Sequence, residues 1–193
     1  MNALGVGALV ALASVSVGAQ SGAQAPARRI ELTAGIAGTY GNLVGGDFGG
    51  TRAAPGFEAN AGVALGRWQL GVGYDRATHA HDGTEGNFVV SNLYFEPRFM
   101  FMNAAREWTP YIAARGGRAT ASYEGFLGLT DKATGYIAGA GVGLLWSAAS
   151  HVQFDGAIHY ARLSHEYDTG DYSDAEKGGR ASARLGIRVG LGR

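Results

Sequence analysis

The sequence contains no cysteine, very little lysine and no surplus of charge of either sign. Without cysteine the chain has no disulfide, no thiolate metal site and no cysteine nucleophile. Its 16 Lys and Arg residues balance 16 Asp and Glu residues, which excludes the basic surplus of a nucleic-acid-binding protein. The 193 residues include 4 prolines but 33 glycines, so they indicate a single domain with many turns or close backbone contacts.

No apolar run is long enough for a helix that crosses a bilayer, which needs roughly 20 residues. Residues 1–17 form an uncharged apolar run that leads into small residues ending at Ala19. A short run of this kind is typical of a secretory signal peptide. We expect residues 1–25 to be a signal peptide and short linker, with cleavage after about Ala19 to Ala25, and residues 26–193 to form the exported domain.

From residue 29 onward the hydrophobic pattern has a period of two, which indicates half-buried β-strands. The alternating segments are 29–41, 56–66, 68–75, 88–101, 108–121, 134–146, 151–163 and 179–193. Long polar connections alternate with short turns, and the long ones are 42–55, 79–87, 122–133 and 164–178. This rhythm predicts an all-β fold, an eight-stranded antiparallel up-and-down barrel with all its long loops at one end.

Acidic and arginine side chains share the polar face of the alternating segments in equal numbers. Equal numbers of opposite charges suit a closed interior, where an unpaired ion is costly, and Arg suits buried carboxylates better than Lys does. We therefore expect a lumen ionic network of Glu31, Glu58, Asp75, Glu96, Arg98, Arg115, Asp155, Arg180, Arg184 and Arg188. Because the first and last strands must meet to close the barrel, Glu31 and Arg188 are a candidate pair.

Aromatic residues gather at the two ends of the apolar face. If the long loops lie outside, one group falls at the short-turn end: Trp68, Phe99, Phe101, Trp108 and Trp146. The other group falls at the long-loop end: Tyr40, Phe57, Tyr74, Tyr136 and Tyr160. Two aromatic girdles around an apolar band are typical of a transmembrane barrel, whereas a soluble ligand-binding barrel would turn its apolar face inward.

The signal peptide, the eight amphipathic strands and the final segment RASARLGIRVGLGR together resemble the small eight-stranded outer-membrane barrels of the OmpA/OmpX type. The resemblance implies an outer-membrane location in a Gram-negative-type bacterium, a monomer, and partners in outer-membrane lipid, lipopolysaccharide and the outer-membrane assembly machinery. It implies no cofactor. Members commonly end on an aromatic residue, whereas this sequence ends on Leu191-Gly192-Arg193.

The function that we expect is a structural or interfacial role, with a closed polar lumen and long extracellular loops. Eight strands leave an interior that side chains just fill, which disfavours a wide pore. Three alternatives stay open at this point: a lipid A-modifying enzyme, a narrow channel for small solutes, and a soluble ligand-binding barrel.

Two histidine-containing clusters fall in segments that the pattern assigns to loops. They are His79-Ala80-His81-Asp82 and Ser164-His165-Glu166. A serine, a histidine and an acid can form an acyl-transfer triad, and a His-x-His pair can bind a metal, but solvated loop residues explain both clusters more simply. We therefore expect no enzymatic activity and no metal site.

Three arginines break the alternation. Arg76, Arg118 and Arg162 have the parity of lipid-facing side chains, and each stands late in an outgoing strand. A charge in the middle of a bilayer is penalised, so we expect them at one height just above the tyrosine girdle. There they either extend toward water or contact lipopolysaccharide phosphates.

Overall fold

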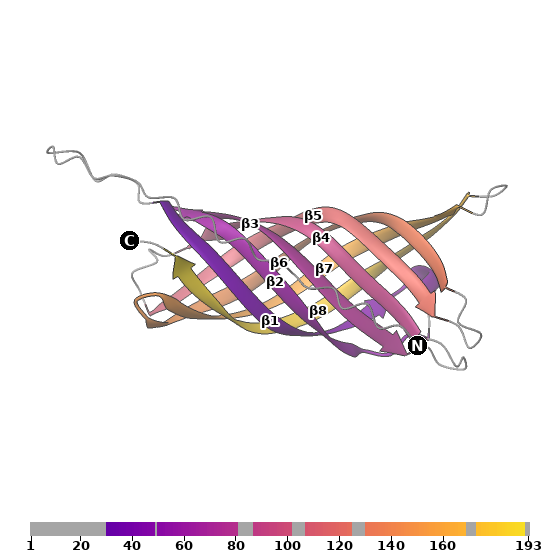
Figure 1. The fold of residues 1–193 in the computed structure, drawn as a ribbon, viewed down its shortest axis with the longest axis horizontal. Coiled ribbons are helices and arrows are strands. Elements are labelled where there is room, and N and C mark those ends of the chain that lie inside the picture. Colours follow the sequence, from indigo (N-terminus) through magenta and orange to yellow (C-terminus); the bar gives the residue numbers. More distant parts are fainter. Residues whose placement is uncertain are drawn as a thin grey trace, which may run out of the picture.

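The computed structural model describes residues 30–48, 50–80, 87–101, 107–124, 130–168 and 173–191. They form one closed barrel in which each strand pairs with its neighbours in the sequence and the last strand pairs with the first (Figure 1). The predicted signal peptide lies outside the described residues. The predicted eight-stranded antiparallel barrel is confirmed.

The chain supplies the strands in order. They are β1 (Ile30–Val44), β2 (Ala54–Leu65), β3 (Trp68–Ala80), β4 (Asn87–Met100), β5 (Trp108–Glu124), β6 (Thr130–Ala149), β7 (Val152–Asp168) and β8 (Ser173–Leu191). A short 3₁₀ helix, η1 (Gly46–Phe48), lies between β1 and β2. Within the described part of the chain, no helix is long and apolar enough to cross a membrane.

The strands are staggered, so they run obliquely to the barrel axis (Figure 1). A path that starts at Glu31 and follows the paired residues through all eight strands returns to β1 at Gly41, ten residues further on. Eight strands with this stagger tilt by about 43° and enclose a lumen that side chains can fill. The first residue of β1 and the last residue of β8 both lie at the short-turn end of the barrel. At the same end, a two-residue turn at Gly66 (φ 66°) joins β2 to β3.

The connections at the loop end are shorter than the sequence predicts, so the expectation of long extracellular loops is wrong. The strands continue through much of the segments assigned to loops: β1 runs to Val44, β5 runs to Glu124 and β7 runs to Asp168. These extensions are rich in Ser, Tyr, Asp and Glu, and they lack the apolar alternation by which a half-buried strand is found. Beyond the bilayer edge the outward face of a strand meets water, so it needs no apolar side chains.

The outward face between the two ends of the barrel is apolar. Ile36, Leu185 and Ile158 are 70%, 71% and 62% exposed, although side chains of this size belong to the core of a soluble protein. Their neighbours in the strands alternate with them and point inward. The barrel is therefore apolar on the outside, which requires a bilayer around it and excludes the soluble ligand-binding barrel.

Within the predicted girdle at the short-turn end, aromatic side chains of neighbouring strands contact one another. At the short-turn end, Trp68 packs edge-on against Phe99, with ring centroids 5.1 Å apart, and Trp146 stacks between Trp108 and Phe154 at 5.5 and 5.2 Å. Phe154 belongs to this girdle, although the sequence analysis did not include it. The remaining girdle side chains are at least partly exposed: Tyr40, Phe57, Tyr74, Phe101, Tyr136 and Tyr160.

An arginine introduced on the outward face of β6 should destabilise the barrel more when it lies deeper in the bilayer. Val142 lies near the middle of the apolar belt and Tyr136 at its loop-side edge. We expect Val142→Arg to lower the free energy of unfolding by about 2 to 4 kcal/mol and Tyr136→Arg by about 1 kcal/mol or less. Equilibrium urea unfolding in lipid vesicles measures both, and equal losses would contradict this position of the membrane.

Candidate functional site

The lumen is the candidate functional region, because the alternation of each strand directs nearly all the buried charges into it. Nine of the ten residues predicted for the ionic network are buried there, with side chains no more than 7% exposed. They come from six strands: Glu58, Asp75, Glu96, Arg98, Arg115, Asp155, Arg180, Arg184 and Arg188. The structure thus brings together residues up to 126 positions apart in the sequence, as in the pair of Arg184 and Glu58.

Arg115 on β5 connects three carboxylates. Its guanidinium donates to Glu58 at 3.0 Å, to Asp75 at 3.2 Å and to Glu96 at 2.8 Å. The ring of Tyr94 lies against the same guanidinium, 3.8 Å from its central carbon. Arg115 therefore joins β5 to β2, β3 and β4, and its charge is met by anions and by a π-face.

Arg184 on β8 connects a second set of acceptors. It donates to Glu58 at 2.6 Å, to Asp155 at 3.2 Å and to the hydroxyl oxygen of Tyr111 at 2.7 Å. The Tyr111 hydroxyl in turn donates to Asp155 at 2.6 Å. Arg98 completes this part of the network, with hydrogen bonds to Glu96 at 2.7 Å and to Asp155 at 2.8 Å.

The ends of the network hold the two remaining arginines. Arg180 is paired with Asp75 toward the loop end. Arg188 donates to Asp155 and to the side-chain oxygen of Asn60, each at 3.2 Å. The five arginines thus exceed the four carboxylates by one, and Asn60 and the aromatic rings supply the additional acceptors.

Glu31, the tenth predicted member, stands apart from the network, and the proposed pair of Glu31 and Arg188 does not form in the structure. Arg188 is paired in register with Gly35, four residues from Glu31, and its side chain extends toward Asp155 and Asn60. Glu31 is half-buried, and its carboxylate lies over Gly190 at the short-turn end. The sequence analysis predicted correctly that β1 and β8 are neighbours. It predicted the wrong residue pairing between them, because the stagger shifts β8 along β1.

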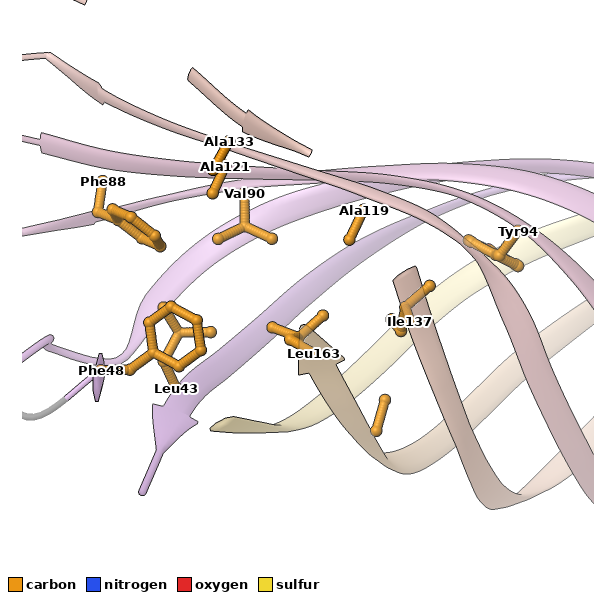
Figure 2. Close-up of a cluster of buried hydrophobic side chains, with 11 residues drawn as sticks. Leu43, Phe48, Phe88, Val90, Tyr94, Ala119, Ala121, Ala133, Ile137 and Leu163 are labelled. Atoms are coloured by element: carbon orange, nitrogen blue, oxygen red, sulfur yellow. The ribbon is translucent and has the colours of Figure 1, made fainter. Parts of the chain in front are cut away.

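Apolar layers lie inside the barrel on both sides of the ionic network, which the sequence analysis did not predict. The larger layer occupies the loop end and consists of Leu43, Phe48, Phe88, Val90, Tyr94, Ala119, Ala121, Ala133, Ile137, Ala161 and Leu163 (Figure 2). The smaller layer occupies the short-turn end and consists of Met100, Tyr111, Ala113, Leu145 and Ala157. The interior therefore combines an ionic middle with apolar layers nearer both ends. A signal was present, because Leu43, Val90 and Leu163 have inward parity.

The Phe48 side chain lies inside the loop end of the lumen. The segment between β1 and β2 turns inward at Gly45 and Gly46, both at positive φ, and places the Phe48 side chain inside the barrel with 4% of its surface exposed. The ring lies 5.6 Å from that of Phe88 and 6.0 Å from that of His165. The Phe48 ring, called the plug below, thus fills part of the lumen beside the other members of the apolar layer.

Among the described residues, two small cavities adjoin the network, one beside His159 and Arg180 and one beside Gln69 and Arg188, and each has a volume of about 10 Å³. That volume accommodates a single water molecule. Neither cavity offers a path for a solute.

The catalytic-looking histidines lie inside the barrel and not in exposed loops. His79 is buried at the end of β3, where its Nδ1 lies 2.9 Å from the carbonyl oxygen of Arg52. Ser164 and His165 are consecutive in β7, so their side chains leave opposite faces of the wall and cannot form a serine–histidine pair. His81 lies outside the described residues. His159 on β7 is also buried inside the barrel, with its Nε2 3.5 Å from Glu96.

Arg76, Arg118 and Arg162 point outward and are exposed. Unlike the lumen arginines, they have no carboxylate partner among the residues that the structure describes. No group of three or more His, Asp or Glu side chains suited to a metal ion occurs in the same residues.

Comparison with known proteins identifies the architecture. No protein-family model matches the sequence, and no curated protein resembles it closely enough to be matched. Among solved structures, Neisserial surface protein A is similar with a TM-score of 0.64 and 17% identity, over 83% of this chain and 96% of that one.

Two further barrels are similar. The attachment invasion locus protein Ail of Yersinia pestis gives a TM-score of 0.51 at 14% identity, over 84% of this chain and 97% of that one. The N-terminal β-barrel domain of Pseudomonas aeruginosa OprF gives 0.50 at 15% identity, over 82% and 97%. The resemblance to small eight-stranded outer-membrane barrels is therefore confirmed for the fold. This fold and its apolar outer belt are those of an integral membrane β-barrel.

The ionic network predicts that removing a paired charge lowers the free energy of unfolding much more than removing an unpaired one. Arg184→Gln removes the cation nearest to Glu58 and one of the three cations beside Asp155, so we expect it to lower the free energy of unfolding by about 3 to 5 kcal/mol. Glu31→Gln removes a charge that has no ion pair in the described structure and should change it by less than about 1 kcal/mol. Urea unfolding midpoints of the two variants in the same vesicles compare them, and similar midpoints would refute the role of the network.

The plug predicts a separate effect on stability. Phe48→Ala removes a buried ring from the loop-end apolar layer and should cost about 3 kcal/mol. Phe48→Leu keeps most of the apolar volume and should cost less than about 1.5 kcal/mol. The same unfolding measurement tests both variants. An alanine variant as stable as the wild type would mean that the ring contributes nothing to closure.

Proposed function

We propose that this protein is a non-catalytic structural component of the outer membrane, a barrel with a closed lumen that acts through its outer and loop-end surfaces. The observation that carries the proposal is the filling of the lumen. Arginine and carboxylate side chains from opposite walls meet in the middle, and apolar layers seal them at both ends.

A narrow channel is the first alternative, and the arrangement of the lumen speaks against it. A permeating ion would have to break several charge-assisted hydrogen bonds in a water-poor interior, each of them costly to leave unmade. It would also have to pass Phe48 and the layer beneath it. The cavities beside the network hold about one water molecule each, which is too little for a continuous water-filled path.

A lipid A-modifying enzyme is the second alternative. Such an enzyme needs its nucleophile and base within hydrogen-bond reach on the outward side of the rim, where the lipid lies. His79 and His165 are both buried inside the barrel, and Ser164 leaves the wall on the face opposite to His165. The described residues therefore give this alternative no support.

Conductance provides the direct test of the closed lumen. We expect the folded wild-type protein in a planar bilayer to show no resolved single-channel steps, because no water-filled path crosses the network. A heat-modifiability gel on the same preparation verifies that the barrel is folded. Regular, protein-dependent conductance steps from folded wild-type protein would overturn the proposal.

A further inference from the structure

The three outward arginines lie at nearly one height on alternate strands. Arg76 on β3 is paired with Ser91 of β4, which is paired with Thr120 of β5, and Arg118 stands two residues nearer the short-turn end than Thr120. The stagger of ten residues over eight strands amounts to two and a half residues over two strands. It offsets the two residues between Arg118 and Thr120, so Arg76 and Arg118 lie at nearly the same height along the barrel axis. The registers through β6 relate Arg118 to Arg162 in the same way.

This height is the edge of the apolar belt on the loop side. Below the arginines, the outward residues of the same strands are Tyr74, Gly116 and Tyr160. Above them, the outward residues include Thr78 and Thr120. The chemical character of the outer surface therefore changes at the arginines, from apolar and aromatic to hydroxyl-bearing.

The distance to the other girdle agrees with a bilayer. Ten residues of β5 separate Trp108 from Arg118. At about 3.3 Å per residue and a tilt of about 43°, they span a height of about 24 Å. An apolar band of about 25 Å is usual for outer-membrane barrels, so the arginines lie where lipid headgroups begin.

Arginines at this position need anionic partners from outside the protein. In the lumen every arginine of the network has a carboxylate partner, whereas these three have none among the described residues. A guanidinium binds phosphate with two parallel hydrogen bonds and stays charged at any physiological pH. Neighbouring members of the set are about 12 Å apart across one intervening strand, a separation suited to a headgroup that carries more than one phosphate.

We propose that Arg76, Arg118 and Arg162 form a binding belt for the phosphates of lipid A, the phosphorylated disaccharide lipid of the outer leaflet. The proposal rests on the outer-membrane location and on the loop end facing outward. It does not depend on whether the lumen conducts, so conductance and lipid binding can fail independently.

Lipid retention tests the belt. The wild-type protein and the variant R76Q/R118Q/R162Q are each folded into phosphatidylcholine vesicles that contain bisphosphorylated lipid A, extracted in mild detergent, and assayed for lipid A per barrel. We expect the triple variant to retain about tenfold less lipid A than the wild type, because it lacks three charge-assisted contacts. Equal retention by the two proteins would overturn the proposal.

Matched controls identify the phosphate and the position. Arg118→Gln and Arg67→Gln remove the same charge, but Arg67 lies in the turn at the opposite end of the barrel, so only Arg118→Gln should reduce retention. Lipid A without phosphates should be retained by the wild type no better than by the triple variant. If phosphatidylglycerol is retained as well as lipid A and depends equally on the three arginines, the belt recognises any anionic headgroup and the proposal for lipid A is wrong.

Folding is verified for every variant on a heat-modifiability gel. If the triple variant does not fold, the comparison of Arg118→Gln with Arg67→Gln decides alone. Equal retention by those two single variants would then overturn the proposal, and a loss confined to Arg118→Gln would support it.

Discussion

A guanidinium moved from water into the closed interior of a barrel loses several kcal/mol of hydration, and only acceptors held at hydrogen-bond distance restore it. The five lumen arginines meet this condition through carboxylates on other strands, as when Arg115 joins Glu58, Asp75 and Glu96. Some of the pairs cross the lumen, as Arg184 of β8 does when it meets Glu96 of β4, so they fix the relative positions of strands that share no backbone hydrogen bonds. The same contacts that stabilise the wall are the ones that would close the passage through it, as the proposed function requires.

The glycine content follows from the same filling. Large inward side chains fit because the facing positions lack a Cβ atom: one added at Gly73 would lie 2.4 Å from the Tyr94 hydroxyl oxygen, and one at Gly143 would lie 2.3 Å from the Tyr111 ring. Both tyrosines lie against arginines of the network, with Tyr94 over Arg115 and Tyr111 over Arg98. Glycines in the wall are thus a condition for the aromatic and ionic contacts in the middle of the lumen. They make room for side chains and do not soften the strands.

Side-chain parity carried most of what the sequence could predict. Alternation placed Glu96 and Arg115 in the lumen and Trp108 on the lipid face, because these directions depend only on counting residues along a strand. Counting residues along a strand does not reveal the stagger between strands. The sequence analysis therefore paired Glu31 with Arg188, whereas the Arg188 side chain contacts Asp155. It also gave no indication that Phe48, which lies outside any strand, turns back into the barrel. The loop lengths were overestimated because a polar ladder outside the bilayer lacks the apolar signal by which strands were recognised.

Arginine occurs on both faces of this wall, and its surroundings decide what each copy does. An inward arginine is enclosed by protein, so its partners must be encoded in the same chain, and the sequence supplies them on neighbouring and opposite strands. An outward arginine at mid-depth would face hydrocarbon, which no partner in the chain relieves, and none is found there in the described strands. Outward arginines occur instead at the one height where hydrocarbon gives way to charged headgroups. The position of Arg76, Arg118 and Arg162 is therefore evidence about the membrane as much as about the protein, because it marks the level at which phosphate becomes available as a partner.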